Sequence, residues 1–313
     1  MSHYIRKIKS EAKIIESWRS DVIQVSILCM VFNHEAFLES AIIGFLSQDA
    51  DFPFEVIIND DCSTDRSREI IQRYALLYPN IIKVIYHDEN MFSQGIRPIN
   101  YLLPKAKGKY ICICEGDDYW IDAHKISAHV EFFRSNPDFS LHVFDAYEED
   151  NVGLDRESSK LNRLKIRSGS YSELEMKTRH VLLPLTSCFK NNFQLPFPRY
   201  FNKSINGDTL LNLKLSNIGK AYVDNTRKVA VYRHHEGGIW SSINREKKYY
   251  EYMHNLLVHS QSLAEDDFIG VSHDKLITMI METIRYIGVK KVFMVLILKL
   301  FRRLNVCNEK DGM

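Results

Sequence analysis

The chain has 313 residues, of which 45% are hydrophobic and 26% are charged, with 41 Lys and Arg residues against 40 Asp and Glu. This balance describes a folded globular protein and excludes a disordered, collagen-like or strongly basic nucleic-acid-binding chain. The six cysteines include no CxxC pair, which indicates free thiols in a reducing compartment. No uncharged apolar run reaches the ~20 residues that a membrane-spanning helix needs, and the first residues have no apolar signal-peptide core.

The charges are unevenly distributed along the chain. Residues 1–20 carry five cationic and two anionic side chains, and residues 289–303 carry five cationic and no anionic ones. We therefore expect a basic helical segment at 1–21. Two basic ends are typical of a chain that rests on an anionic membrane.

From residue 24 to about residue 144, short apolar runs alternate with stretches of helical periodicity. Strands are predicted at 24–31, 54–58, 81–86 and 110–114, and helices at 36–48, 64–77 and 123–135. The second of these helices is expected to have Ser63 or Thr64 as its N-cap. The alternation predicts an α/β fold with a mostly parallel sheet flanked by helices, in which ligands bind at the carboxyl ends of the strands.

The second half of the chain has a weaker pattern. Residues 145–165 are polar and are predicted to form a loop, followed by an apolar stretch at 182–190, a helix at 209–218 and strands within 221–233. Helical periodicity continues at 244–264, 273–287 and 289–304. We therefore expect a main domain at 22–242 and a C-terminal helical region at 243–313.

Three carboxylates follow the strand at 110–114 in the sequence Glu115-Gly116-Asp117-Asp118. Their mutual repulsion at the end of a buried strand favours a bound cation, and oxygen ligands favour Mg²⁺ or Mn²⁺. A solvated acidic turn explains the same residues. This motif alone leaves both interpretations open.

Three other polar positions have both a structural and a functional interpretation. Asp60 and Asp61 end the second strand, where they either cap the following helix or accept a hydrogen bond from a base or a ribose. Asp208 begins a predicted helix, either as its N-cap or as a general base. His235 lies in a Gly-rich turn, where it is either solvated or a ligand of a metal or phosphate.

Two common phosphate-binding loops are missing from the sequence. No two glycines lie two positions apart, so there is no G-x-G-x-x-G loop, and there is no GxxxxGK[ST] sequence either. A nicotinamide-dependent oxidoreductase and a P-loop kinase are therefore disfavoured. Any phosphate group is expected to be held by a metal ion and by side chains.

Taken in order, these segments resemble the family 2 glycosyltransferases, which have the GT-A nucleotide-diphospho-sugar transferase fold. The resemblance covers about residues 22–242. It rests on Val25-Ser26-Ile27 with Asn33 and Glu35, Asp60-Asp61-x-Ser63-Thr64-Asp65, Ala106-x-Gly108-Lys109-Tyr110-Ile111, Glu115-Gly116-Asp117-Asp118-Tyr119-Trp120, Gly207-Asp208, and Tyr232-Arg233-x-His235-x-Gly237-Gly238-x-Trp240-Ser241. It implies a metal-dependent, inverting transfer of a sugar from a nucleotide donor, expected to be a UDP-sugar, to an acceptor hydroxyl.

The resemblance also implies roles for individual residues. Asp208 would be the catalytic base, and Glu115, Asp117 and His235 would bind Mn²⁺ or Mg²⁺ beside the diphosphate, with Glu115 in place of the family's usual aspartate. Cys62 stands where the family usually has glycine, so we expect a turn without positive φ there. The nucleotide would be contacted by Phe32, Asn33, Glu35, Asp60, Asp61, Arg97, Glu115 and Gly116.

The basic stretch at 289–303 has two interpretations. It is either an interfacial helix whose apolar face rests on anionic lipid or a helix packed on the main domain. In the first case the protein would be cytoplasmic and peripheral on the inner face of the cytoplasmic membrane, with a lipid-linked glycan as acceptor. The resemblance further implies a role in bacterial surface polysaccharide synthesis, such as that of O-antigen, capsule or lipopolysaccharide. The net charge of +1 gives no reason to expect a nucleic-acid partner.

Two other functions fit the same sequence. A non-catalytic nucleotide-sugar-binding relative would have the same fold, although it would have no use for Asp208 as a base. A Mg²⁺-dependent nucleotidyltransferase or phosphoesterase would use the same acidic edge of the sheet. The product released from a UDP-sugar separates these functions.

Overall fold

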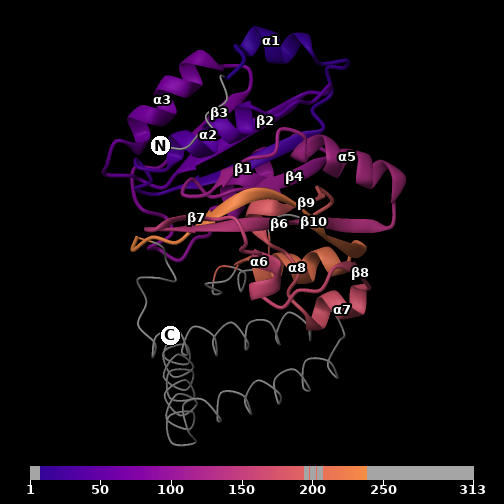
Figure 1. Cartoon of the computed structure of the whole chain (residues 1–313). Helices are drawn as coiled ribbons and strands as arrows, with labels where there is room; N and C mark the ends of the chain where they lie inside the picture. The colour runs from indigo at the N-terminus through magenta and orange to yellow at the C-terminus, as the bar shows by residue number, and fades with distance from the viewer. Residues whose placement is uncertain (1–7, 194–196, 198–201, 203–206, 238–313) are drawn as a thin grey trace, which may run out of the picture. The chain divides into compact units, whose positions relative to one another are not determined.

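A computed structural model describes residues 8–193, 197, 202 and 207–237 of the chain (Figure 1). The predicted C-terminal helical region at 243–313, its basic stretch at 289–303, and the motif residues Trp240 and Ser241 lie outside these described residues. Within the described part, no helix is long and apolar enough to cross a bilayer. The described cysteines are free thiols: Cys29, Cys62, Cys112, Cys114 and Cys188.

A mixed β-sheet forms the core of the described part. Its strand order is β3-β2-β1-β4-β9-β6-β10-β5, with β7 paired to β6 and β8 paired to β10. The strands are β1 (Val25–Val31), β2 (Phe54–Asp60), β3 (Ile82–Tyr86), β4 (Tyr110–Ile113), β5 (Tyr119–Trp120), β6 (Phe139–Asp150), β7 (Gly153–Asp155), β8 (Gly169–Tyr171), β9 (Ser187–Lys190) and β10 (Lys220–Arg233). The expected α/β fold is confirmed.

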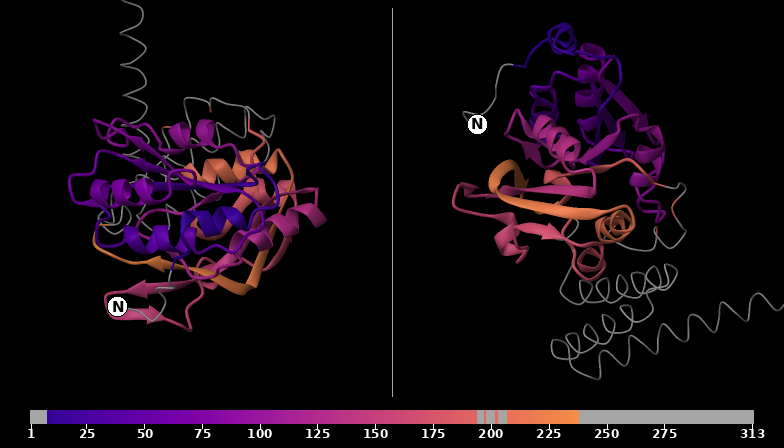
Figure 2. Two further views of the ribbon diagram at one scale, coloured as in Figure 1. Left: turned by 90° about the horizontal axis from the view of Figure 1, so that it is seen from above. Right: turned by 90° about the vertical axis from the view of Figure 1, so that its right-hand side faces the viewer.

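The direction of the strands brings their functional ends together. β1 to β4 are parallel, as the alternating pattern predicted. β9 is antiparallel to both β4 and β6, and β6 is parallel to its long neighbour β10. The orange strand β10 runs through the sheet in Figures 1 and 2. Two reversals restore the original direction, so the carboxyl ends of β1 to β4, β6 and β10 all lie at one edge of the sheet.

Helices pack against several strands of this sheet. α2 contacts α3 and β5, α3 contacts β2 and β3, and α5 contacts β6. α7 and α8 pack against each other and against β10, below the sheet in Figure 1. The helices are α1 (Glu11–Glu16), α2 (Leu38–Leu46), α3 (Ser67–Leu77), α4 (Ile99–Leu102), α5 (Lys125–Ser135), α6 (Lys160–Arg163), α7 (Glu173–Thr178) and α8 (Gly207–Ser216), with short 3₁₀ turns at Leu103–Lys105 and Pro184–Thr186.

Helix α1 lies within the N-terminal segment and is attached to the sheet domain. The Tyr78 hydroxyl donates a hydrogen bond to the Lys9 carbonyl at 2.9 Å. The Glu11 carboxylate accepts one from the Asn80 backbone N–H at 2.7 Å. The ring of Trp18, just after α1, packs edge-on against a core ring of β2. These contacts tie residues 9–18 to the same unit as the sheet.

The prediction of a loop over residues 145–165 is wrong. β6 continues to residue 150, and β7 and α6 follow it. The carboxylate of Asp145 is buried and accepts hydrogen bonds from the Leu161 backbone N–H at 3.0 Å and the Ser159 hydroxyl at 2.6 Å. The Asp145 carboxylate therefore belongs to an internal polar network, which the sequence cannot distinguish from a solvated loop.

The predicted N-cap of the second helix is also wrong. α3 begins at Ser67 after Arg66, whose side chain makes no capping bond. Ser63 is used elsewhere, because its hydroxyl accepts a hydrogen bond from the Asn33 backbone N–H at 3.0 Å. The polar residues before α3 therefore join two loops of the sheet edge.

A buried histidine pair joins α5 to β6. His129 and His142 are 0% and 4% exposed, and their Nδ1 atoms lie 3.1 Å apart. His129 Nε2 lies 3.1 Å from the carbonyl oxygen of Thr186. Burial lowers the pKa of both rings, that of His142 to about 3, so both rings are neutral at pH 7.

Replacing this pair should change how stability depends on pH. Both histidines ionise near pH 6.5 in the unfolded chain but stay neutral when folded, so unfolding takes up protons as the pH falls below 6.5. Relative to a His129→Met/His142→Phe variant, the wild type should lose up to about 1.4 kcal/mol per pH unit for each histidine. Urea unfolding at pH 7 and pH 5 measures this, because other titrating groups are common to both proteins. If wild type and variant differed by the same free energy of unfolding at pH 7 and pH 5, the two histidines would not be neutral in the folded protein.

Candidate active site

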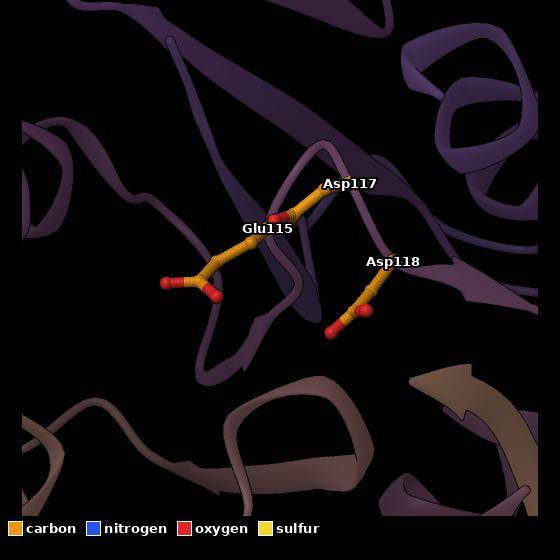
Figure 3. A group of neighbouring side chains, drawn as sticks. All are labelled: Glu115, Asp117 and Asp118. Atoms are coloured by element: carbon orange, nitrogen blue, oxygen red, sulfur yellow. The ribbon is translucent and has the colours of Figure 1, made fainter. Parts of the chain in front are cut away.

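Three carboxylates converge in the loop after β4. One ligand oxygen from each of Glu115, Asp117 and Asp118 lies within 4.8 Å of the others. Figure 3 shows their side chains leaving the same loop. Asp118 is buried, Asp117 is half-buried and Glu115 is exposed. Like charges at this spacing repel one another, so the fully ionised loop needs cationic partners.

This repulsion affects the protonation of two of the three carboxylates. Burial and the charge of Asp117 raise the pKa of Asp118 well above its ordinary value. Burial, followed by the charges of Asp117 and Asp208, raises the pKa of Glu115 to about 8. The side chain of Glu115 is exposed to solvent, so the geometry supports the negative charges of its acidic neighbours, more than burial, as the cause of the rise in its pKa.

Asp117 is the carboxylate that the protein keeps ionised. Its Oδ2 lies 3.0 Å from His235 Nε2 and 3.7 Å from His34 Nε2. Burial acts to raise the pKa of Asp117, but the His235 hydrogen bond and the charge of His34 outweigh it and lower that pKa. Its other oxygen, Oδ1, is buried and has no hydrogen-bond partner among the described residues. An orphaned buried carboxylate oxygen is costly unless a cation or water binds it.

The end of β10 and close packing hold the acidic loop in place. The Arg233 backbone N–H donates to Asp118 Oδ1 at 2.8 Å, and its guanidinium donates to the Asp117 carbonyl oxygen at 3.0 Å. A Cβ atom at Gly116 would lie only 2.9 Å from His34 Nδ1. Position 116 therefore has no room for a side chain, and Gly116, predicted as a nucleotide contact, is required for the packing of this loop.

The loop fits a divalent metal ion. Its carboxylate oxygens are the hard ligands that Mg²⁺ and Mn²⁺ prefer, and Asp117 Oδ1 is shielded and unpaired within the described structure. Of the predicted ligands, Glu115 and Asp117 belong to the group, and Asp118 joins them. His235 contacts Asp117 directly and lies beside the group.

Asp208 lies at the start of α8, where the sequence placed it. Its Oδ1 accepts a hydrogen bond from the Thr209 backbone N–H at 2.8 Å, and its Oδ2 lies 3.4 Å from His180 Nε2. Burial acts to raise the pKa of Asp208, but the charge and hydrogen bond of His180 outweigh it and lower that pKa. The carboxylate is therefore ionised at neutral pH, as a general base must be.

Asn33 and Glu35 interlock the loops that follow β1 and β2. Asn33, with φ +56°, accepts a hydrogen bond from the Thr64 backbone N–H at 2.8 Å. The Glu35 carboxylate accepts one from the Arg66 backbone N–H at 2.9 Å. Both side chains therefore shape the sheet edge, and their contact with a nucleotide stays a prediction.

The prediction of a turn without positive φ at Cys62 is wrong. Cys62 has φ +64°, in the left-handed region that favours glycine. This conformation costs a residue with a Cβ atom about 1 kcal/mol. The backbone at this position therefore has the left-handed conformation that favours glycine, although the residue is a cysteine.

Asp60 and Asp61 are buried at the end of β2 and have partners within the protein. Asp60 Oδ2 accepts a hydrogen bond from Arg68 Nε at 2.9 Å. The two carboxylate oxygens of Asp61 accept from the backbone N–H groups of Met91 and Phe92 at 2.8 and 3.0 Å. Asp61 thus orders the loop after β3 and Asp60 binds the first turn of α3, so a base contact would use their remaining lone pairs.

Phe32 and Arg97 lie in different loops of the sheet edge. Phe32 follows β1 and is 43% exposed. Arg97 follows β3, and its guanidinium carbon lies 4.5 Å from the centroid of the Phe92 ring. Neither placement tests the predicted nucleotide contact.

Three basic residues near the carboxylates were not among the predicted site residues. His34 contacts Asp117, and His180 contacts the predicted base. Lys160 is 5% exposed, with its Nζ 3.4 Å from Glu148 Oε1. His34 was visible as a polar residue directly after the first strand. Lys160 lies in the stretch interpreted as a loop, and the isolated His180 carries no motif.

Comparison with known protein families shows which family the chain belongs to. The family model of glycosyl transferase family 2 matches residues 26–200, more than half of the chain. The chain belongs to this family. The resemblance inferred from the motifs is thereby confirmed.

Curated relatives of this family 2 protein match shorter regions. A protein of Mycobacterium tuberculosis without an assigned function is 37% identical over 118 residues, which cover 37% of this chain and 33% of the relative. The putative teichuronic acid biosynthesis glycosyltransferase TuaG of Bacillus subtilis is 31% identical over 133 residues, which cover 42% of this chain and 51% of TuaG. The match therefore spans about a third to a half of these relatives.

Solved structures of other glycosyltransferases share the fold. Residues 1–349 of Staphylococcus aureus TarS, a poly(ribitol-phosphate) β-N-acetylglucosaminyltransferase, in complex with UDP-GlcNAc, match with a TM-score of 0.61 at 20% identity, over 84% of this chain and 73% of that one. The mannosyltransferase PcManGT of Pyrobaculum calidifontis, in complex with GDP-Man and Mn²⁺, matches with a TM-score of 0.54 at 12% identity, over 94% and 87%. The likeness confirms the GT-A fold.

Removing the Asp117 carboxylate should abolish stabilisation by manganese. At a Mn²⁺ concentration a hundredfold above its Kd, the wild-type Tm should rise by roughly 5–10 °C, because the ion binds only the folded chain. Asp117→Asn should show almost no rise, since it loses the unpaired anionic oxygen. Thermal unfolding with and without MnCl₂ measures this effect. The exposed Glu131→Gln variant on α5 serves as control and should respond like the wild type. A normal Mn²⁺ response of Asp117→Asn would contradict the proposed ion site.

Proposed function

We propose that this family 2 protein is an inverting glycosyltransferase that moves a sugar from a UDP-sugar to the hydroxyl group of a glycan or lipid-linked glycan, with Mn²⁺ or Mg²⁺ as cofactor. One observation carries the proposal. The charge of Asp208 acts to raise the pKa of Glu115 in the acidic loop, and that loop contains the unpaired Asp117 Oδ1. A base and an ion-binding oxygen therefore belong to one site.

The chemistry follows from these groups. A divalent ion held by Asp117 and Glu115 would supply charge stabilisation for the departing diphosphate. Asp208 accepts the proton as the acceptor O–H bond breaks and the acceptor oxygen bonds to the anomeric carbon. The bond from that carbon to the diphosphate breaks on the opposite face, and its electron pair leaves with the nucleotide. A single displacement of this kind inverts the anomeric configuration.

The names of the relatives support the choice of substrates. TarS has been solved with UDP-GlcNAc, which supports a UDP-sugar donor, and PcManGT with GDP-Man and Mn²⁺, which makes GDP-Man the second donor to test. TuaG and TarS are named for teichuronic acid and poly(ribitol-phosphate), which supports an acceptor in bacterial polysaccharide synthesis. Membrane contact through residues 289–303 and a cytoplasmic location stay predictions.

Asp208→Asn should lose transferase activity and keep the nucleotide. Loss of a general base should lower kcat by about 10²- to 10⁴-fold, while the Kd for UDP with Mn²⁺ should change less than twofold, because Asp208 is not placed on the nucleotide. The kcat is measured as release of UDP from UDP-GlcNAc and UDP-hexoses, and as release of GDP from GDP-Man. The Kd for UDP is measured by calorimetry. Asp138→Asn, an exposed carboxylate before β6, is the matched control and should behave like the wild type.

The products of the same assay separate the other functions. Release of inorganic phosphate or diphosphate by the wild type would identify a phosphoesterase or a nucleotidyltransferase. Nucleotide-sugar binding without any release would identify a non-catalytic relative. Lost UDP affinity in Asp208→Asn would place this residue on the nucleotide and contradict its assignment as base.

A further inference from the structure

Each oxygen of the Asp208 carboxylate has a polar neighbour. The Thr209 backbone N–H donates to Oδ1 at 2.8 Å, and His180 Nε2 lies 3.4 Å from Oδ2. His180 and Asp208 are each about one-third exposed at the side chain, so the pair lies at the rim of the site and is open to an acceptor. The Thr209 hydrogen bond fixes one oxygen, and the His180 ring lies within ion-pair distance of the other, where it is placed to limit rotation of the carboxylate.

The backbone around His180 is fixed to the helix that carries Asp208. Asn212 lies four residues after Asp208 on α8, and therefore on the same face of that helix. Asn212 is 2% exposed. Its Oδ1 accepts a hydrogen bond from the Val181 backbone N–H at 3.1 Å, and its Nδ2 donates to the Arg179 carbonyl oxygen at 3.2 Å. Both neighbours of His180 are thus anchored one turn away from the base.

The imidazole of His180 has one described polar partner. Its Nε2 faces Asp208, and its Nδ1 is buried without a hydrogen-bond partner in the part of the chain that the structure describes. A ring that leaves one nitrogen unpaired in order to face a carboxylate is not explained by the needs of the core. Its contact with the base gives the ring a role.

The contact of His180 with Asp208 favours the ionised form of that carboxylate. Glu115 and Asp208 repel each other, so Asp208 gains from a donor that favours its ionised form. Among the described residues, His180 is the titratable group whose attraction lowers the pKa of Asp208. A hydrogen bond to the ionised form, at a fixed angle, both orients a base and keeps it ready to accept a proton.

We propose that His180 is a positioning residue for Asp208, so that the two side chains form a His–Asp dyad in which His180 Nε2–H orients the carboxylate that takes the acceptor proton. The inference rests on the proposed function, since it assigns a partner to the proposed base. The proton passes from the acceptor oxygen to Asp208 as described above, and His180 donates its hydrogen bond throughout without giving up its proton.

The test compares substitutions of His180 in the full-length chain. UDP release from UDP-GlcNAc, or from the UDP-hexose that the wild type cleaves fastest, is measured with Mn²⁺ and water as acceptor. His180→Ala should lower kcat by roughly 10-fold or more, with the donor KM and the Mn²⁺ dependence within twofold of wild type, because a charge-assisted hydrogen bond is lost. His180→Gln, whose side-chain amide can donate from the position of Nε2, should keep most of the activity.

Two further measurements separate positioning from a structural role. Millimolar imidazole should restore part of the activity of His180→Ala, because it can occupy the vacated space and donate to Asp208. It should have no effect on Asp208→Asn. His124→Ala, an exposed histidine before α5, is the matched control and should keep wild-type kcat. Circular dichroism of each variant checks that it is folded.

Three outcomes would overturn the inference. These are wild-type kcat in His180→Ala, a loss of activity that neither imidazole nor glutamine restores in a folded protein, and an altered Mn²⁺ dependence that would place His180 on the ion. Asp208→Asn distinguishes this failure from failure of the proposed function. If Asp208→Asn is inactive while His180→Ala is normal, the base assignment stands and the dyad does not. If Asp208→Asn is active, the base assignment itself fails.

Discussion

Repulsion among Glu115, Asp117 and Asp118 is the constraint on which the rest of the site depends. Three carboxylates within 4.8 Å cannot all be ionised in a folded protein without compensating positive charge. The protein supplies polar partners for one oxygen of Asp117, because the Nε2 atoms of His34 and His235 face it, but burial lowers the pKa of His34 and so disfavours a positive charge on that ring. The other oxygen is buried and has no partner among the described residues. The site therefore fits a cation, and the diphosphate of a sugar nucleotide would bind the same cation.

The topology of the sheet makes this arrangement available. Because β9 runs against both β4 and β6, the ends of β6 and β10 return to the edge where β1, β2 and β4 end. Asp117 and His235 are separated by 118 residues and still contact each other there. Arg233 closes the connection, since its backbone and guanidinium both bind the acidic loop. An insertion or a register change in β10 would therefore act on the ion site, even though β10 carries no carboxylate of that site.

The first half of the fold could be predicted from the sequence because its signals are local. Strands that are buried on both faces are continuous apolar runs, and β1, β2 and β4 lie within one or two residues of their predicted bounds. The carboxylates of Glu115, Asp117 and Asp118 were likewise visible because they are neighbours in the sequence. Family membership added what a motif in isolation could not supply, namely a reason to connect this loop with Asp208 and His235.

The remainder could not be predicted because the deciding interactions are distant in sequence. The charged residues at 145–165 indicated a loop, but Asp145 lies in β6 and its carboxylate is satisfied by partners in the following segment. Cys62 takes a left-handed backbone in the loop after β2, and its own side chain gives no sign of this. His180 is an isolated histidine, and only the folded chain brings it to 3.4 Å from Asp208, with both of its neighbours held by Asn212.

The most direct test of the account is a crystal structure of the protein with Mn²⁺ and UDP, in which anomalous scattering locates the manganese. The account predicts one manganese ion bound by Asp117 Oδ1, with Glu115 in the same group and the diphosphate of UDP completing its coordination. Manganese bound elsewhere, or UDP bound with Glu115 and Asp117 facing bulk water, would contradict it.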